Sequence, residues 1–374
     1  MAGKIEKKES SGQADFILVT IILSLLLFGF VMLFSASSPS AASGGVFRLI
    51  LRQGTILLLG VAIMFFSATR DYHIYRKLNR ILFVSTLALM IIVPIFGFAS
   101  HGATRQISLG FIGVQPSEFA KFVLVIYFAT RFTSKDTQNL TTDYKNIGTC
   151  LSVIVAFGFA CYMQSHMSAA IVLAAISILM MLIAGFNVER KWKVIGGLSA
   201  LGIAALFIFT EEYRMNRILA LFDPFKYKRG IGWQIVQSLY AVGSGGLFGL
   251  GLGRSRQKFN YLPEAQNDYI FAVVCEELGF IGGLVVILLF VLLFWRGMSI
   301  ALNAKDRYGM YMAFGITSII GIQMLINIGV VLSVLPSTGM QLPLFSSGGS
   351  SMIATMWGLG ILVNISKNSK IKKL

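Results

Sequence analysis

Residues 232–283 read GWQIVQSLYAVGSGGLFGLGLGRSRQKFNYLPEAQNDYIFAVVCEELGFIGG. The stretch begins as a polar, glycine-rich loop and ends inside an apolar helix, and Asp268 lies at the join. A chain that only spans a membrane does not need such a loop. A long basic loop that ends in a carboxylate at a membrane surface favours chemistry on a charged lipid.

The rest of the chain is strongly apolar, with 56% hydrophobic residues and a mean hydropathy of +0.76. Runs of about 20 apolar residues match a hydrocarbon core of roughly 30 Å, and in lipid such runs must be helices. We therefore predict an all-α polytopic membrane protein, a single integral membrane domain over residues 1–374, and exclude a soluble core. The ten predicted transmembrane helices cover residues 14–37, 47–68, 78–98, 116–133, 145–163, 168–186, 192–210, 269–295, 310–335 and 347–366.

The distribution of charge predicts the orientation of these helices. The net charge is +16, and most Lys and Arg residues lie in short loops, which favours topology and anionic lipid headgroups over nucleic acid as the explanation. Both termini are expected in the cytoplasm, with basic tails at 1–13 and 367–374. A large extracellular loop at 211–268 separates the seventh and eighth helices, and long loops cross the membrane largely regardless of charge.

Glycine and basic residues in the large loop suit a pyrophosphate. Gly245 and Gly246 let the backbone approach a ligand closely, and Arg256 and Lys258 follow at once. The glycines alternate with large apolar residues, which indicates a re-entrant or interfacial segment. An equally supported alternative is a loop that packs on the helix bundle and whose charges contact lipid headgroups.

Asp268 has two interpretations. Aspartate is a favoured helix cap, and the residues alone favour a cap in or before the first turn of the eighth helix. The alternative is a general base at the membrane surface that takes a proton from an attacking hydroxyl. Glu276 and Glu277 follow inside the same helix, where they need partners, which we expect to be basic residues of neighbouring helices.

Two further polar segments border the predicted helices. Glu118 and Lys121 share one face at the start of the fourth helix, where an ion pair is expected as a structural bridge. Residues 336–351, which include Ser350, join the last two helices and are expected to line a cavity beside the Asp268 loop. No His, Cys or carboxylate pattern has metal-ligand spacing, so no protein-bound metal site is predicted.

Together these motifs resemble the SEDS family (shape, elongation, division and sporulation). The resemblance covers nearly the whole chain, and the loop sequence is closer to the division and sporulation branch, FtsW and SpoVE, than to RodA. It rests on the segments QPSEFAK at 115–121, YRMNRI at 213–218, FDPF at 222–225, GWQIVQSLYAVGSGGLFGLGLG at 232–253, YLPEAQNDYIFAVVCEELG at 261–279 and LPSTGMQLPLFSSGGSS at 335–351.

The resemblance implies a peptidoglycan glycosyltransferase that polymerises lipid II on the outer face of the bacterial plasma membrane during cell division or sporulation. For this branch of the family it implies a location at the septum. It implies a class B penicillin-binding protein as transpeptidase partner, alongside other division or elongation proteins. The essential aspartate of the family corresponds to Asp268, now preferred as general base, and the acid and base of QPSEFAK correspond to Glu118 and Lys121. No organic cofactor is expected, and a divalent cation, Mg or Mn, is left open.

The implied reaction is an inverting displacement with a pyrophosphate leaving group. The basic residues expected to offset its charge are Arg48, Arg214, Arg217, Arg256 and Lys258. The chain departs from the family pattern at Gln106, at Gln164–His166 and at Ser347, which leaves the secondary site roles open. Two alternatives remain: a flippase for the lipid-linked precursor, and a non-catalytic scaffold of the division machinery.

Overall fold

The computed structural model describes residues 12–37, 46–96, 98–100, 103–109, 112–134, 144–186, 215, 219–230, 232–259, 261–263 and 265–369. Side chains are described for fewer residues, because those of 46–50, 98–100, 103–104, 108–109, 112 and 144–145 are excluded. The predicted seventh helix at 192–210 lies outside the described residues, as do Arg214 and Arg217. The side chain of Arg48 also lies outside them.

The described chain is mostly helical, as expected for an all-α polytopic membrane protein. Seven of its helices are long and apolar enough to cross a membrane, and α6 is a shorter apolar helix. The elements are α1 (Phe16–Ser37), α2 (Val46–Thr69), α3 (Ile74–Phe96), β1 (Phe98–Ser100), β2 (Ala103–Leu109), β3 (Ile112–Val114), α4 (Pro116–Phe132), α5 (Tyr144–Met163), α6 (Met167–Ile183), α9 (Trp233–Ser244), α10 (Ile270–Leu302), α11 (Arg307–Val331) and α12 (Gly349–Lys367).

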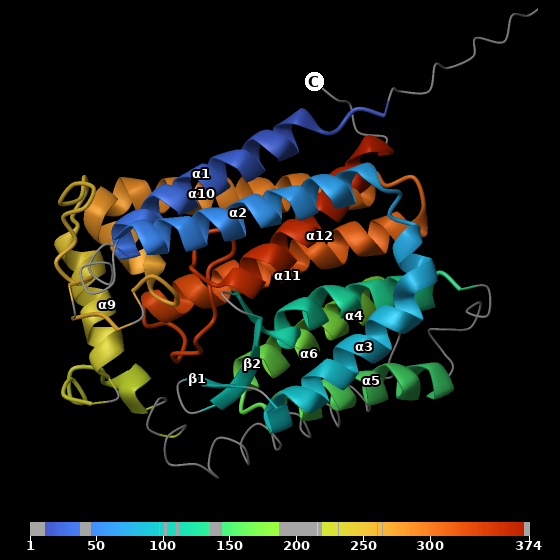
Figure 1. The fold of residues 1–374 in the computed structure, drawn as a ribbon, viewed down its shortest axis with the longest axis horizontal. Coiled ribbons are helices and arrows are strands. Elements are labelled where there is room, and N and C mark those ends of the chain that lie inside the picture. The colour runs from blue at the N-terminus through green and yellow to red at the C-terminus, as the bar shows by residue number, and fades with distance from the viewer. Residues whose placement is uncertain are drawn as a thin grey trace, which may run out of the picture.

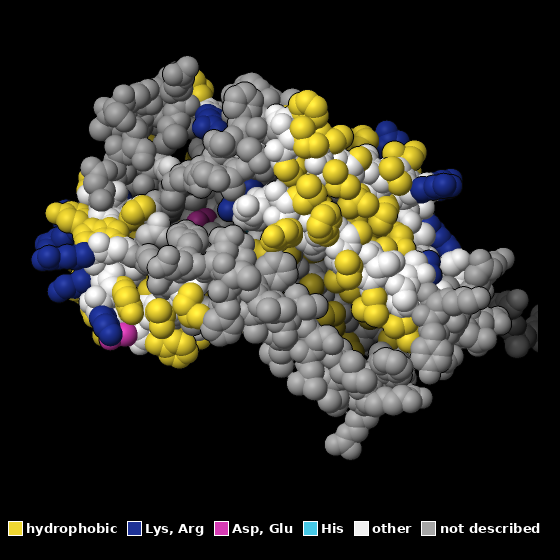
Figure 2. Space-filling view, turned by 90° about the horizontal axis from the view of Figure 1, so that it is seen from below, with side chains coloured by type: hydrophobic (Ala, Val, Ile, Leu, Met, Phe, Trp, Pro, Cys, Tyr) yellow, Lys and Arg dark blue, Asp and Glu magenta, His cyan; other side chains and the backbone are white. Residues whose placement is uncertain are grey.

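The long helices form a bundle in which their axes run side by side, and the short helix α9 (Trp233–Ser244) lies across one end of it (Figure 1). α2 packs on α12, α11 packs on α10 and α4, and α1 packs on α10. Large apolar side chains of the outer helices are exposed, including Leu58 at 71% and Phe65 at 69% on α2. Figure 2 shows hydrophobic side chains over the middle of one face and Lys and Arg side chains toward both ends. This distribution suits a bundle surrounded by lipid in its middle and by water at its ends.

A small sheet departs from the all-helical prediction. β2 pairs antiparallel with β1, where Ser100 faces Ala103, and with β3, where Leu109 faces Ile112. The sheet occupies the predicted outer loop between the third and fourth helices. Alternation of side chains over such short segments is too weak to be recognised beside long apolar runs.

Helix α11 begins at the end of the bundle opposite α9, and Asp306 caps it. The carboxylate accepts hydrogen bonds from the Gly309 amide at 2.6 Å and from the Tyr72 hydroxyl at 2.5 Å, and it lies 3.0 Å from His73 Nε2. Burial alone would raise the pKa of Asp306, but these hydrogen bonds and the His73 ring outweigh it and hold that pKa below its usual value.

Candidate functional site

Asp268 lies where three segments of the chain meet. It is partly buried and stands one residue before Tyr269, which is the residue that caps α10. The prediction that Asp268 is the cap or part of the first turn is therefore wrong, because the cap position belongs to Tyr269. An ideal Cβ at Gly339 would lie 3.4 Å from Asp268 Oδ2, so the carboxylate faces the backbone that joins α11 to α12.

The segment between α11 and α12 is bonded to the residues just before α10. Ser346 Oγ donates to the carbonyl of Asn267 at 2.5 Å and accepts from the Leu342 amide at 2.9 Å. The Ser347 amide donates to the carbonyl of Gln266 at 3.1 Å. These bonds place residues 336–348 beside Asp268, as the sequence predicted for their position.

A second polar cluster lies at the start of α4. Lys121 Nζ donates to Glu118 Oε2 at 2.7 Å, and both side chains are buried, so the predicted ion pair is present. Glu118 also has a side-chain hydrogen bond with Ser351 at the start of α12. Ser350, the next residue back, donates to the carbonyl of Gly113 at 2.5 Å and accepts from the Gln115 amide at 2.8 Å.

His166 completes this second cluster from the break between α5 and α6. Its Nδ1 lies 3.2 Å from both Gln115 Nε2 and Ser117 Oγ, and the ring is buried. Burial and the nearby Arg105 lower the pKa of His166 to about 4, so the ring is neutral at physiological pH. The first turns of α4 and α12 are thus held together by uncharged contacts around one buried ion pair.

The large loop interrupts α10. Gly279 has φ +70°, which is not helical. At this break, backbone groups of α10 form hydrogen bonds with the loop in place of bonds within the helix. The amides of Leu250 and Gly251 donate to the carbonyls of Glu276 and Glu277 at 3.0 Å each. In return the Phe280 amide donates to the carbonyl of Gly246 at 2.8 Å. Glycine is needed at 279, because a Cβ there would lie 2.4 Å from the Gly249 nitrogen.

These backbone hydrogen bonds attach the loop to α10 at a point well inside the helix, past its first turn. Glu276 lies six residues after Ile270, which places it roughly 9 Å farther along the helix axis. The exposed neighbours Leu247 and Phe248 are apolar, with 63% and 80% of their surface accessible. The re-entrant or interfacial position of this segment in the membrane stays a prediction.

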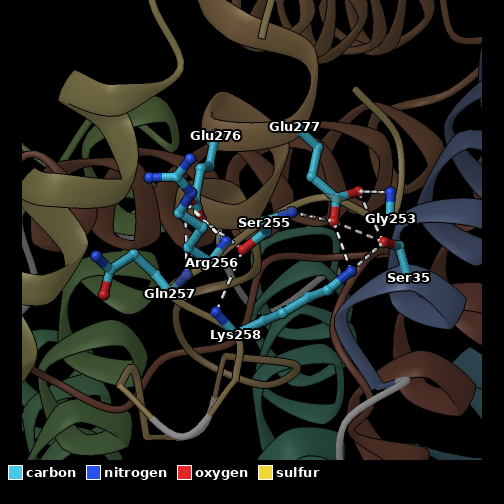
Figure 3. A network of polar contacts seen from close by, with 8 residues as sticks. All are labelled: Ser35, Gly253, Ser255, Arg256, Gln257, Lys258, Glu276 and Glu277. Atoms are coloured by element: carbon cyan, nitrogen blue, oxygen red, sulfur yellow. Dashed lines mark hydrogen bonds and ion pairs between the residues drawn. The ribbon is translucent and has the colours of Figure 1, made fainter. Parts of the chain in front are cut away.

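The two buried glutamates bind the loop (Figure 3). Glu277 pairs with Lys258 Nζ at 2.8 Å, and Ser35 Oγ of α1 donates to it at 2.7 Å. Glu276 accepts from the Arg256 amide at 2.9 Å and from the Ser255 hydroxyl. Glu277 thus has the expected basic partner, but Lys258 comes from the loop and not from a neighbouring helix, and Glu276 is bound by a backbone amide and a hydroxyl.

This network changes the interpretation of two predicted substrate residues. Both side chains of the Lys258–Glu277 pair are fully buried, so the ammonium is turned away from any outer ligand. At Gly245 an added Cβ would lie 1.9 Å from the carbonyl oxygen of Cys275, so the absent side chain makes room for α10. The structure thus gives both residues packing roles in place of the expected substrate contacts.

Two loop residues keep an orientation that suits a ligand. Arg256 is bound through its backbone, and its side chain is exposed. Gly246 has φ +53°, and nothing lies within 4 Å of an added Cβ. Among the described residues, no group of three His, Cys, Asp or Glu side chains could hold a metal ion.

Sequence reasoning did not identify Asn327, which lies within α11 and contacts the Asp268 backbone. The sequence could have indicated it, because a polar amide inside an apolar membrane helix is costly unless it forms hydrogen bonds within the protein. It also missed the Asp15–Arg296 pair, in which Arg296 Nη2 lies 2.6 Å from Asp15 Oδ2 and α1 is joined to α10. That pairing depends on helix packing, which spacing in the sequence does not reveal.

Comparison with known proteins gives a consistent match over the whole chain. A family model described as "Cell cycle protein", which covers FtsW, RodA and SpoVE, matches residues 16–371. Stage V sporulation protein E of Bacillus subtilis (strain 168) is 39% identical over 360 residues, covering 95% of this chain and 98% of that protein. A probable peptidoglycan glycosyltransferase FtsW of Geobacter sp. (strain M18) is 38% identical over 360 residues, covering 94% and 96%.

Solved structures share the fold. A chain from "Structural coordination of polymerization and crosslinking by a peptidoglycan synthase complex" has a TM-score of 0.79 and 26% identity, with 96% of this chain and 98% of that chain covered. Rod shape determining protein RodA of Thermus thermophilus has a TM-score of 0.70 and 25% identity, covering 96% and 98%.

Proposed function

This chain belongs to the FtsW, RodA and SpoVE family of cell cycle proteins, and we propose that it is a peptidoglycan glycosyltransferase that polymerises lipid II in division or sporulation. Relatives that match over nearly their full length are named peptidoglycan glycosyltransferases. The position of Asp268 is the observation that supports placing the active site at this residue. It is a partly buried carboxylate, held by its backbone at the junction of α10, α11 and the 336–348 segment.

Asp268 acts as the general base in this proposal. Its carboxylate takes the proton from the C4 hydroxyl of the acceptor sugar, and that oxygen forms a bond to the anomeric carbon of the donor. The bond from the anomeric carbon to the lipid pyrophosphate breaks, and the pyrophosphate leaves with the electron pair. An α-linked donor that yields a β-linked polymer requires inversion, and therefore a single direct displacement. A general base contributes about 10²–10⁴-fold to such a step.

Positive charge must stabilise the departing pyrophosphate. Among the residues that the structure describes, Arg256 is the candidate for this charge, because its side chain is exposed. It belongs to the same loop as Gly246, where nothing lies within 4 Å of an added Cβ. Arg48, Arg214 and Arg217 remain proposed for the same role. A divalent cation brought by the pyrophosphate is a further proposal, tested by loss of polymer with EDTA and its return with Mg or Mn.

We also propose the membrane topology. Residues 192–210 form the seventh of ten transmembrane helices, both termini are cytoplasmic, and residues 211–268 belong to an extracellular loop. This orientation is supported by the Lys and Arg residues of the predicted cytoplasmic gaps. The similar chain from a complex that coordinates polymerization and crosslinking supports a crosslinking partner, which we propose is a class B penicillin-binding protein acting with this chain at the septum.

The test separates polymerisation from transport. Purified protein and its crosslinking partner are reconstituted in proteoliposomes with fluorescent lipid II, and glycan strands are resolved on a gel while headgroup translocation is followed in parallel. We expect strands from the wild type and no acceleration of translocation. Translocation without strands would overturn the proposal and support a flippase, whereas strands formed only by the partner would support a scaffold.

A further inference from the structure

We infer that Asn327 is a positioning residue for Asp268, an inference that rests on the proposed function. Asn327 is completely buried on α11, one turn before that helix ends. Its Nδ2 donates to the carbonyl of Asp268 at 2.8 Å and to the carbonyl of Met340 at 2.8 Å. One amide group therefore joins α11, the entry to α10 and the segment that precedes α12.

The orientation of this amide follows from its surroundings. An amide nitrogen carries two hydrogens and can donate both, whereas the amide oxygen only accepts. If the group were rotated by half a turn, its oxygen would face two carbonyl oxygens and both bonds would be lost. The two backbone carbonyls therefore fix the Asn327 amide in the orientation in which its nitrogen donates both hydrogens.

The two carbonyls belong to the two stretches of chain that meet at the proposed base. One belongs to Asp268 itself, and the other belongs to Met340, the neighbour of Gly339, whose backbone the Asp268 carboxylate faces. Gly339 adopts φ +68°, which favours glycine, and because glycine has no side chain the Asp268 carboxylate faces bare backbone here. Asn327 thereby sets the distance between the carboxylate and the backbone opposite it.

Loss of Asn327 should displace the base without releasing the segment. The Ser346 hydroxyl and the Ser347 amide bind the same two stretches of chain independently, at 2.5 and 3.1 Å. A displacement of about 1 Å in a reacting group can cost roughly 10²-fold in rate. We therefore expect an effect on turnover that is larger than the effect on folding.

Gln323 supplies a matched control. It lies one helical turn earlier on α11 and is buried to 1% exposure, and neither of its amide atoms has a hydrogen-bond partner among the described residues. Gln323→Ala therefore removes a buried amide from the same helix without removing a bond to the site. Asn327→Ser supplies a smaller replacement that keeps one hydroxyl donor.

The experiment compares these variants in lipid II polymerisation, with kcat, KM and the thermal midpoint measured for each. We expect kcat of Asn327→Ala to fall about 10²-fold with KM within about twofold, Asn327→Ser to lie between it and wild type, and Gln323→Ala to retain wild-type kcat. Asn327→Ala should have the lower midpoint of the two, because it alone loses two hydrogen bonds, but it should remain folded at the assay temperature.

Three results would overturn the inference. They are wild-type kcat in Asn327→Ala, an equal loss of kcat in Gln323→Ala, and failure of both Asn327 variants to fold while Gln323→Ala folds. Inactive wild type with its partner present would instead count against the proposed function. Active wild type together with an unaffected Asn327→Ala would leave the function standing and remove only the positioning role.

Discussion

Substitution of Lys258 by methionine tests the buried network that holds the large loop. Lys258 Nζ lies 2.8 Å from Glu277 Oε1 and 3.0 Å from Ser35 Oγ, and both side chains of the ion pair are fully buried. Methionine fills a similar volume but carries no charge. The substitution therefore leaves Glu277 as a buried acid without its counter-ion.

The expected loss of stability can be bounded. Breaking a buried ion pair by removing one partner costs about 3–5 kcal/mol, because the remaining charge is uncompensated. Glu277 keeps three other donors, namely the amides of Gly253 and Ser255 and the hydroxyl of Ser35. We therefore expect the lower end of the range, about 3 kcal/mol. An unfolding entropy of about 2.1 cal/mol/K per residue over 374 residues gives roughly 1.3 °C per kcal/mol, so this corresponds to a decrease in Tm of about 4 °C.

The assay is thermal unfolding of detergent-solubilised protein, combined with a double-mutant cycle. The double variant Lys258→Met/Glu277→Gln removes both charges, and neutral replacement of a buried pair is often nearly neutral in stability. We expect it to be more stable than Lys258→Met alone, with a coupling energy of about 2 kcal/mol. Lys228→Met, at an exposed lysine of the same loop, is the control and should stay within about 0.5 kcal/mol of wild type.

Two outcomes would refute this reasoning. One is a Tm of Lys258→Met equal to that of the Lys228→Met control. The other is additivity in the cycle, which would mean that the two buried side chains do not interact in the folded protein.

The remaining predictions concern α10, α11 and the loop surface. Gly279→Ala should prevent recovery of monodisperse protein in size-exclusion chromatography, because it forces a Cβ into the loop backbone, whereas Gly148→Ala in α5 meets nothing within 4 Å and should behave as wild type. The pKa of Asp306 is depressed in the folded state, so its stabilisation is complete above the unfolded value of about 3.9 and is lost as pH falls through the lower folded value. The difference in Tm between wild type and Asp306→Asn should accordingly be largest near neutral pH and vanish in strong acid. Arg256→Ala should lower the rate of lipid II polymerisation up to about tenfold without lowering Tm, and an unchanged rate would remove Arg256 from the proposed leaving-group contacts.

The helical framework could be predicted from the sequence because the bilayer restricts the choices. Apolar runs in lipid must satisfy their own backbone bonds, so they form helices of predictable length. The start of α4 at Pro116 and the end of α5 at Met163 agree with the predicted bounds. The pair of Glu118 and Lys121 followed from helical spacing alone.

Other features depend on contacts between segments that are distant in the sequence. In the sequence Lys258 resembles a phosphate ligand, because it lies in a basic loop 19 residues before Glu277. The pairing of the two side chains becomes visible only once the loop is folded onto α10. Asn327 looked like one polar residue in an apolar helix, and its two carbonyl partners become visible only when α10 and α11 are packed. Spacing along one helix carries no information about either contact.

The most direct test of the account is the turnover of lipid II by Asp268→Asn, measured with the crosslinking partner and normalised to folded protein. Asparagine keeps the size of the side chain but cannot accept the proton, so we predict a fall of at least about 10²-fold in kcat, with Tm unchanged. Asp223→Asn, at an exposed acid of the same loop, should retain the wild-type rate. Wild-type turnover by Asp268→Asn would contradict the assignment of this carboxylate as the general base.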